Sequence, residues 1–199
     1  MQQTIGENNR QAAYDIDPVN TNRWSPRSFS SKPVEDRDLL AVMEAARWAP
    51  SAFNDQPWRF IIARSEEDRL KFYSFISEFN LVWCKSAPVL IMIVSQAVTE
   101  RGVSRSHAFD TGSSWGLMAL EATRKGLSTH AMTGFDFDKA REVLQIPEGY
   151  ELQALVALGY RGEKEQLPEA LQEREQPSPR RAIEESLFEG GFRQPLKLN

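Results

Sequence analysis

Two arginines and a serine in the segment RWSPRSF, residues 23–29, could together hold a phosphate. Arg23 and Arg27 each offer a planar guanidinium group, and Ser25 adds a hydroxyl between them. Pro26 stiffens the turn that carries them. The alternative is a solvent-exposed basic loop that pairs with surface acids, because short motifs of this kind also arise by chance.

The segment PSAFNDQPWRF, residues 50–60, carries polar groups of another kind. Ser51, Asn54 and Gln56 supply a hydroxyl and two amides, which suit a ligand with donors and acceptors along one polar edge. The alternative is turn chemistry, in which these side chains satisfy the loop backbone and Pro57 directs the chain into the next strand.

A third candidate is AMTGFD, residues 131–136, where Gly134 permits an unusual backbone angle or the close approach of a flat ligand. The alternative is an ordinary turn from a strand into a helix, with Asp136 or Asp138 as the helix cap.

The elements that must position these segments alternate between helical and strand patterns. Apolar residues recur at helical spacing from Val34 to Ala49, and Pro50 ends that helix. The run APVLIMIVS, residues 87–95, is unbroken, as expected of a strand buried on both faces. Further patterns predict helices over 65–80, 104–126 and 137–146 and strands over 58–64, 127–132 and 151–160. We therefore expect an α/β or α+β domain with a mostly covered sheet.

The long helix over 104–126 has a face of small residues, with Ala108, Gly112 and Gly116 four positions apart. Glycine in a helix costs about 1 kcal/mol relative to alanine, so another backbone is expected to pass close to this face. That backbone belongs either to the core of the same chain or to a symmetric partner helix, and the pattern favours neither.

Composition excludes several classes of function. The net charge of −4 leaves no basic excess for binding nucleic acid. One cysteine and two histidines allow no internal disulfide and speak against a metal site. The chain lacks the GxGxxG, GxxxxGK[ST] and GxSxG motifs of Rossmann, P-loop and hydrolase sites. The polar N-terminus and the short apolar runs predict neither a signal peptide nor a membrane span, so we expect a cytoplasmic location.

The chain resembles the nitroreductase family of FMN-dependent oxidoreductases in the order of its motifs. That order is RxSxR, APSxxNxQPWxF, a buried strand, a glycine-containing long helix, the GFD turn and a basic tail. The resemblance extends from about Arg23 to Arg181, and its most specific part is APSAFNDQPWRF. It implies an α+β fold, a three-layer α/β/α sandwich, whose subunits form an interlocked homodimer with C-terminal arm exchange.

The resemblance also implies how the chain is divided. Residues 1–13 are expected to form a flexible N-terminal arm, residues 14–161 an FMN-binding nitroreductase-like domain, and residues 162–199 a C-terminal arm that docks on the partner subunit. The apolar end of this polar arm, around Phe188 and Phe192, agrees with docking. The alternative is a helix that folds back on the same subunit.

The FMN-binding residues implied by the resemblance are Arg23, Trp24, Ser25, Arg27, Pro50, Ser51, Ala52, Asn54, Gln56, Asn80, Ala131, Met132, Thr133, Gly134, Arg180 and Arg181. The segment 23–27 and the pair 180–181 would hold the phosphate and ribityl chain, with Trp24 offering mainly its backbone. The loop 50–56 would come from the partner subunit over the flavin. The turn 131–134 would lie behind the ring, with Asn80 near its pyrimidine edge.

The activity implied is the reduction of nitroaromatics, quinones or similar small acceptors by NAD(P)H in a ping-pong reaction. The flavin would carry the electrons, so no catalytic side chain and no Rossmann motif is expected. Residues 96–107 match no familiar lid, and Trp24 and Thr133 depart from residues common in the family, so the substrate stays open. Dehalogenation, flavin fragmentation or enoyl reduction on the same scaffold, a flavin-binding module without turnover, and a dimer that has lost its cofactor are the alternatives.

Overall fold

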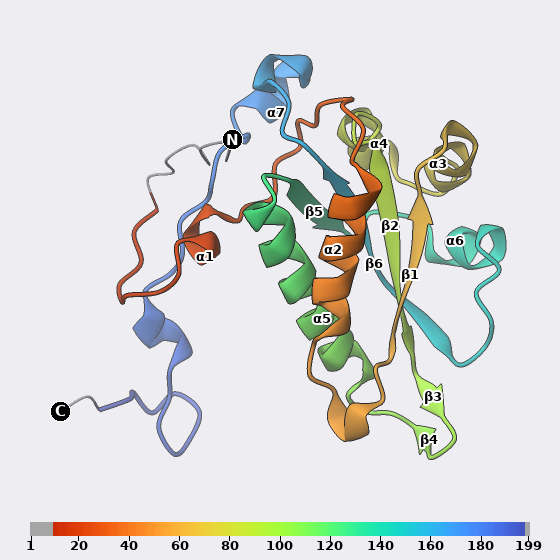
Figure 1. The fold of residues 1–199 in the computed structure, drawn as a ribbon. Coiled ribbons are helices and arrows are strands. Elements are labelled where there is room, and N and C mark those ends of the chain that lie inside the picture. Colours follow the sequence, from red (N-terminus) through yellow and green to blue (C-terminus); the bar gives the residue numbers. More distant parts are fainter. Residues whose placement is uncertain (1–9, 198–199) are drawn as a thin grey trace.

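Four antiparallel strands in the order β1-β2-β6-β5 form the central sheet (Figure 1). A computed structural model describes residues 10–197 of the chain. The strands are β1 Trp58–Ala63, β2 Val89–Gln96, β5 Ser128–Met132 and β6 Tyr150–Gly159. Helices and strands are mixed along the chain and every strand pairing is antiparallel, so the fold is α+β, as predicted.

The strand β2 lies inside the sheet because its apolar side chains are covered on both faces. Its first seven residues are all buried, which confirms the interpretation of the unbroken apolar run. Met92 pairs with Leu155 of β6, and the register shifts between Ile93 and Val94. Since neighbouring side chains of a strand point to opposite faces, Met92 and Ile93 enter two separate core clusters.

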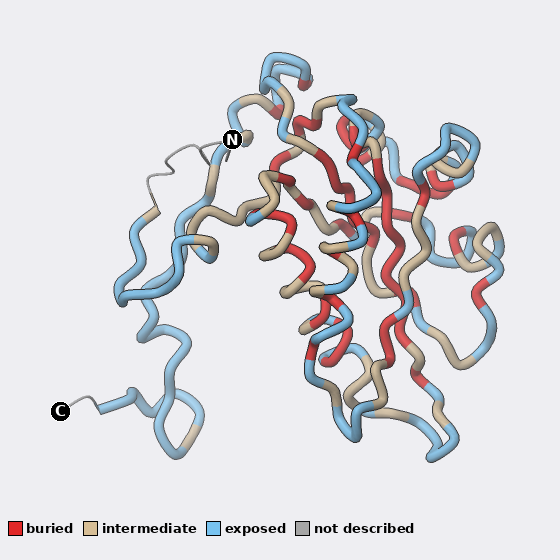
Figure 2. Tube along the Cα trace, in the orientation of Figure 1, coloured by how far each residue is buried: buried red, intermediate tan, exposed pale blue. Residues whose placement is uncertain are grey.

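One face of the sheet is covered by α2, Asp36–Arg47, and α5, His107–Arg124. Val42 of α2 and Met118 of α5 are fully buried and pack in one cluster with Ile93 of β2. Figure 2 shows the buried residues of both helices on the sides that meet the sheet and each other. The helical spacing of apolar residues after Val34 therefore predicted the helix and most of its buried face, although Leu40, one of these apolar residues, is 66% exposed.

The other face is covered by three shorter helices: α3 Glu66–Tyr73, α4 Glu78–Cys84 and α6 Phe137–Val143. Phe72, Trp83 and Leu155 belong to the core cluster on this side. The single helix predicted over 65–80 is wrong.

The chain leaves the helical path after Tyr73 because its backbone groups find partners outside the helix. The carbonyl of Phe75 accepts a hydrogen bond from the N–H of Asp136 (2.8 Å), and the N–H of Ser77 donates to Gly134 (3.0 Å). Ile76 forms an isolated β-bridge with Phe135. The turn after β5 therefore separates α3 from α4, which local sequence periodicity could not indicate.

Residues 96–107, which matched nothing familiar, contain a small hairpin of β3, Val98–Thr99, and β4, Gly102–Val103. Gly102 has φ 99°, a conformation that glycine adopts without strain. The hairpin lies at the same end of the molecule as the loop that follows α2 (Figure 1). The short elements are α1 Val19–Asn22, the 3₁₀ turns Ala52–Asn54, Lys164–Gln166 and Ile183–Ser186, and α7 Glu169–Gln172.

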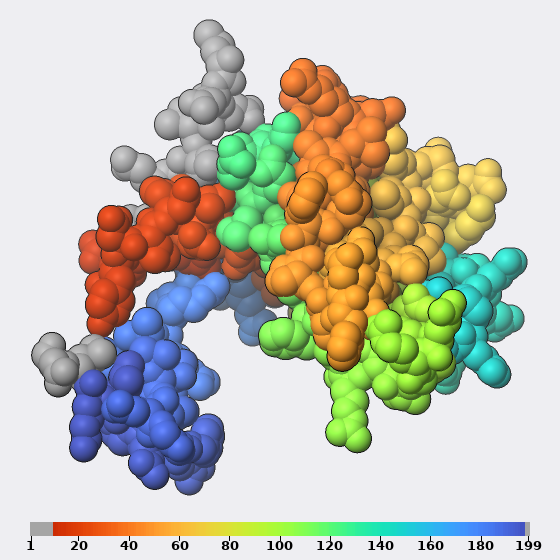
Figure 3. All heavy atoms as spheres, turned by 60° about the horizontal axis from the view of Figure 1, so that its bottom comes forward, coloured from red at the N-terminus to blue at the C-terminus, as the bar shows by residue number. Residues whose placement is uncertain are grey.

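The two terminal segments extend from the body of the molecule on the same side (Figures 1 and 3). Leu167 and Leu171 still belong to the core, whereas Ile183 is 39% exposed and Phe192 80% exposed. Residues 1–9 of the predicted N-terminal arm lie outside the described residues. No helix in the described part of the chain is long and apolar enough to cross a lipid bilayer.

The two glycines on the small-residue face of α5 have open space beside them among residues 10–197. A Cβ atom built on Gly112 or Gly116 would meet no atom of the described residues within 4 Å, apart from the helix's own backbone. Ala108 and Gly112 are exposed, and Phe109 beside them is 81% exposed. Tight packing in the chain's own core, one of the two explanations for these glycines, is therefore excluded within residues 10–197.

Candidate cofactor-binding site

The turn that carries Arg23, Ser25 and Arg27 lies against β5 and is held there by a histidine. His130 Nδ1 lies 2.9 Å from the carbonyl oxygen of Pro26. A carbonyl can only accept, so the ring donates and Nδ1 carries the hydrogen. The imidazole also packs on Trp83, with 4.5 Å between the ring centroids. Burial lowers the pKa of His130, and the positive charges of Arg27 and Arg23 lower it further.

Positive charges from three distant segments gather at this turn. Burial lowers the pKa of both Arg10 and Arg23, and the positive charge of Arg180 lowers each of them further. Mutual repulsion between cations is relieved when an anion binds among them. The Nε atom of Arg27 is buried and has no hydrogen-bond partner among the described residues. The arrangement therefore suits an anion with several acceptor oxygens.

The other residues predicted to hold the phosphate and ribityl chain lie around this cluster of cations. The hydroxyl of Ser25 accepts a hydrogen bond from Arg23 Nη1 at 3.3 Å. Trp24, Arg180 and Arg181 line one broad groove between the body and the terminal segments. The structure thus brings together the N-terminal and C-terminal basic motifs that the sequence separates by more than 150 positions.

The turn after β5 combines a buried anchor with an accessible stretch. Met132 is buried and Ala131 partly buried, whereas Thr133 is exposed. The carbonyl of Gly134 accepts from Asn80 Nδ2 at 3.1 Å, and a Cβ atom at Gly134 would lie 2.3 Å from that nitrogen. Any side chain at position 134 would therefore displace the Asn80 amide from its two hydrogen bonds. Asp136 caps α6 by accepting from the N–H of Lys139, as one alternative predicted.

Asn80 is buried, and both ends of its amide are engaged in this chain. Its oxygen accepts from the Trp83 indole N–H at 3.3 Å, while its nitrogen donates to Gly134. These contacts fasten α4 to the turn after β5. Asn80 thus has a structural role in this chain, besides the contact with a flavin that the resemblance implies.

The loop after α2 is built around left-handed backbone angles. Phe53, Asn54 and Gln56 have φ of 53°, 58° and 46°. Ser51 Oγ accepts a hydrogen bond from the N–H of Gln56 at 3.0 Å, so part of the loop's polarity serves turn chemistry. Pro50, Ala52 and Asn54 are exposed, and Phe53 is 85% exposed.

Two groups outside the loop fix its shape. The buried carboxylate of Asp110 accepts from the Ala52 N–H at 3.1 Å and from the Ser106 hydroxyl at 2.9 Å. Arg101 of the β3–β4 hairpin forms an ion pair with Asp55. Its guanidinium also lies 4.9 Å from the centre of the Phe53 ring. The hairpin and the N-terminal turn of α5 therefore position the loop.

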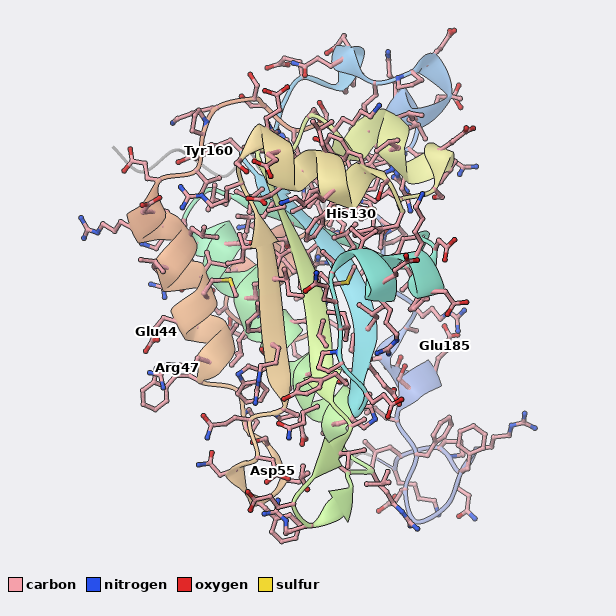
Figure 4. The ribbon with its side chains drawn as sticks, turned by 90° about the vertical axis from the view of Figure 1, so that its right-hand side faces the viewer. Glu44, Arg47, Asp55, His130, Tyr160 and Glu185 are labelled. Carbon is pink, nitrogen blue, oxygen red and sulfur yellow. The ribbon has the colours of Figure 1, made fainter. Side chains whose placement is uncertain are left out.

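Within one chain, the loop at residues 50–56 and the arginine turn at residues 23–28 lie at opposite ends of the sheet. The loop leads into Trp58, which pairs with Ser95 and through it with Glu151 at the start of β6. The turn continues to Phe29, which bridges to Arg161 beyond the end of β6. Ten residues of strand separate these points, which is roughly 30 Å. Figure 4 shows Asp55 of the loop far from His130 beside the turn.

Residues of the site that were not predicted include Arg10, Arg101, Asp110, His130 and Glu175. His130 directly precedes the AMTG segment and is one of only two histidines, a signal that was available in the sequence. Arg10 and Asp110 had no such signal, because their partners are fixed by the fold. No group of three or more possible metal ligands occurs among residues 10–197.

The chain matches the model of the nitroreductase family over residues 21–83 and 76–160. A solved structure described as an oxidoreductase containing FMN is 40% identical, covers 94% of this chain and 98% of its own, and superposes with a TM-score of 0.90. An NADH dehydrogenase of Thermus thermophilus is 27% identical over 175 residues, 71% of this chain and 84% of the relative. An iodotyrosine deiodinase of Thermotoga neapolitana is 26% identical over 166 residues, 69% of this chain and 84% of the relative.

Proposed function

The chain belongs to the nitroreductase family, and from this premise we propose that it is an FMN-dependent oxidoreductase. It takes electrons from NAD(P)H and passes them to a small acceptor such as a nitroaromatic or a quinone. The observation that carries this proposal is the cluster of cations at the turn 23–27, beside an accessible glycine turn at the end of β5.

The residues present fit the phosphate end of FMN. Arg27 has a buried Nε without a partner among residues 10–197, and Arg23 lies among cations whose repulsion an anion would relieve. A phosphate offers the several acceptor oxygens that these donors need. Arg180 and Arg181, on the C-terminal segment, would close on the same group. The 40% identical structure, described as containing FMN, supports FMN as the ligand.

The side chains bind and orient, and the flavin would supply the electron transfer itself. Arg23, Ser25 and Arg27 would hold the phosphate. His130 keeps their turn against β5 by donating to Pro26. The backbone of Thr133 and Gly134 would lie along the ring, with Gly134 kept small by its contact with Asn80.

We further propose that two chains form an interlocked homodimer of three-layer sandwiches with exchanged C-terminal arms. The open face of α5, with Phe109 81% exposed beside Gly112, supports a partner helix there. The separation of roughly 30 Å between the loop 50–56 and the arginine turn supports a site that takes the loop from the second chain. The loop, with Ser51, Asn54 and Gln56, would then cover the flavin and exclude water.

A second candidate acceptor is a halogenated phenol, because the Thermotoga neapolitana relative named an iodotyrosine deiodinase is almost as similar as the Thermus thermophilus relative named an NADH dehydrogenase. Both reactions would use the same flavin and differ in the acceptor. The acceptor would meet the loop 50–56 and the β3–β4 hairpin, which is fastened to that loop by Arg101.

The test is an absorbance spectrum of the purified protein before and after NADH or NADPH is added without oxygen. We expect a yellow protein that releases FMN on denaturation and is bleached by at least one nucleotide. Nitrobenzene derivatives, quinones and iodotyrosine, added in turn, would identify the acceptor by restoring the colour. A colourless protein that takes up no added FMN would overturn the proposal.

A further inference from the structure

A glutamate from the far end of the chain holds the backbone of the arginine turn. The N–H of Arg27 donates to both carboxylate oxygens of Glu175, at 2.9 Å each, and the N–H of Ser28 donates to one of them at 2.8 Å. The partners are 147 and 148 residues apart in sequence. Hydrogen bonds between a carboxylate and backbone N–H groups are stronger than neutral ones because the acceptor is charged.

A second link joins the same two segments a few residues further on. Arg10 donates from Nε to the carbonyl of Ser178 at 2.8 Å and from Nη1 to the carbonyl of Arg23 at 2.7 Å. One side chain thus bridges the C-terminal segment and the start of the arginine turn. Arg180, two residues beyond Ser178, is close enough to lower the pKa of both Arg10 and Arg23.

The carboxylate of Glu175 leaves the side-chain donors of the turn unused. It occupies backbone N–H groups only, so the guanidinium groups of Arg23 and Arg27 stay available for a ligand. Without Glu175, those two N–H groups would lose their acceptor, and the turn would lose a contact that fixes its shape. The segment after β6 also holds the turn in place, because the N–H of Gly162 donates to the Ser28 carbonyl at 3.0 Å.

We propose that Glu175 is a positioning residue that couples the C-terminal arm to the cofactor site. It fastens the arm to the arginine turn and so places Arg180 and Arg181 beside the phosphate. The coupling is reciprocal: an arm held in place strengthens FMN binding, and bound FMN holds the arm in place. This inference rests on the proposed function, because the ligand at the turn is taken to be FMN.

Glu175 also carries a negative charge, and the effect of this charge must be distinguished from the positioning of the turn. The charge would lie near a phosphate held by this turn and would weaken binding by repulsion. Glu175→Gln keeps one acceptor oxygen and removes the charge, whereas Glu175→Ala removes both. Positioning therefore predicts that alanine weakens binding and that glutamine largely retains it. A purely electrostatic role predicts tighter binding in both variants.

The experiment uses full-length protein freed of its flavin, with Glu173→Ala as the matched control, since Glu173 is an exposed carboxylate two residues away. FMN affinity is measured by the quenching of flavin fluorescence. Trypsin cleavage after Arg180 and Arg181 is followed by mass spectrometry with and without FMN. We expect Glu175→Ala to weaken FMN binding about tenfold or more, because the Arg27 and Ser28 N–H groups lose their acceptor, and Glu175→Gln, which keeps an acceptor oxygen, to change it less than about threefold.

FMN should slow cleavage of the arm in the wild-type protein and in Glu173→Ala, and much less in Glu175→Ala. If Glu175→Ala does not fold, the cleavage rates of the wild-type protein still test the coupling. An arm that trypsin cuts equally fast with and without FMN overturns it. Unchanged affinity and cleavage in a folded Glu175→Ala protein also overturn it, while the proposed function stands. A wild-type protein that binds no FMN overturns both.

Discussion

Two polar loops, the arginine turn at residues 23–28 and the loop at residues 50–56, are held in very different ways. The arginine turn is fastened by groups from β5, from the segment after β6 and from the C-terminal segment: His130, Gly162 and Glu175. The loop 50–56 is fastened from one side, by Asp110 and Arg101 near its own end of the sheet.

The difference indicates what each region can do without a partner. The arginine turn has its cations assembled within one chain, so under the proposed function that chain alone would hold the phosphate. The loop presents Phe53 and Asn54 largely to solvent on left-handed backbone, with the Arg101 guanidinium 4.9 Å from the centre of the Phe53 ring. Exposed polar and aromatic groups held in one shape are typical of half of an interface. The four following predictions separate the regions, from the largest expected effect to the smallest.

Arg27→Ala should weaken FMN binding about 10- to 100-fold, because a hydrogen bond to a charged group contributes about 1.5–3 kcal/mol. The measurement is flavin fluorescence quenching on titration into flavin-free protein. Arg37→Ala, an exposed arginine on α2, is the control and should bind as the wild type does. Equal affinity in Arg27→Ala and the wild type would remove the arginine turn from the phosphate site.

Mixing subunits should show whether the loop acts on the neighbouring chain. Arg27→Ala and Asn54→Ala should each lose most NAD(P)H-dependent reductase activity as pure homodimers. After subunit exchange in a 1:1 mixture, half of the dimers are hybrids with one intact site, so about a quarter of wild-type activity should return. The check is a steady-state assay of the mixture, with each variant exchanged against itself as the control. No recovery would mean that both segments serve the same chain's site.

Asp110→Asn should loosen the loop 50–56 while leaving the arginine turn intact. The substitution puts an amide where a carboxylate accepted from the Ala52 N–H and the Ser106 hydroxyl, so stability should fall by about 1–3 kcal/mol. Urea denaturation measures this fall in stability. We also expect the KM for the electron acceptor to rise several-fold while the FMN content of the protein stays unchanged. Glu121→Gln, on the same helix, is the control. A loss of FMN with unchanged KM would contradict the separation of the two regions.

His130 should make the arginine turn sensitive to acid. Its pKa is lowered in the folded protein from an ordinary value of 6.5, so the unfolded chain binds more protons as the pH falls below that value. Stability should therefore be fully present above about pH 6.5 and decline as the pH drops toward the lowered pKa. Denaturation at pH 7.5 and pH 5.5 should show a larger loss in the wild type than in His130→Gln. Equal losses would show that this histidine does not contribute.

Much of the fold was predictable because its signals are local. The unbroken run of β2, the apolar spacing of α2 and the stop at Pro50 each depend on residues within one turn or one strand. The break between α3 and α4 was missed because residues 75–77 bond to the turn 134–136, about 60 positions away. The β3–β4 hairpin was missed because its strands are two residues each, too short for a pattern.

The candidate site also has features that the sequence indicated and features that depend on contacts between distant residues. Neither RxSxR nor NxQPW alone distinguished a binding site from ordinary turn chemistry, and it was their order along the chain, through the family resemblance, that indicated the arginine turn and the loop. The contacts of Arg10, His130 and Glu175 with the turn, and the roughly 30 Å between turn and loop, depend on how the sheet orders its strands. Sequence by itself determined which charged and polar side chains are available and which local helices and strands carry them. The tertiary structure decided which of them meet, because strand pairing brings together residues more than 100 positions apart and keeps others at opposite ends of one strand.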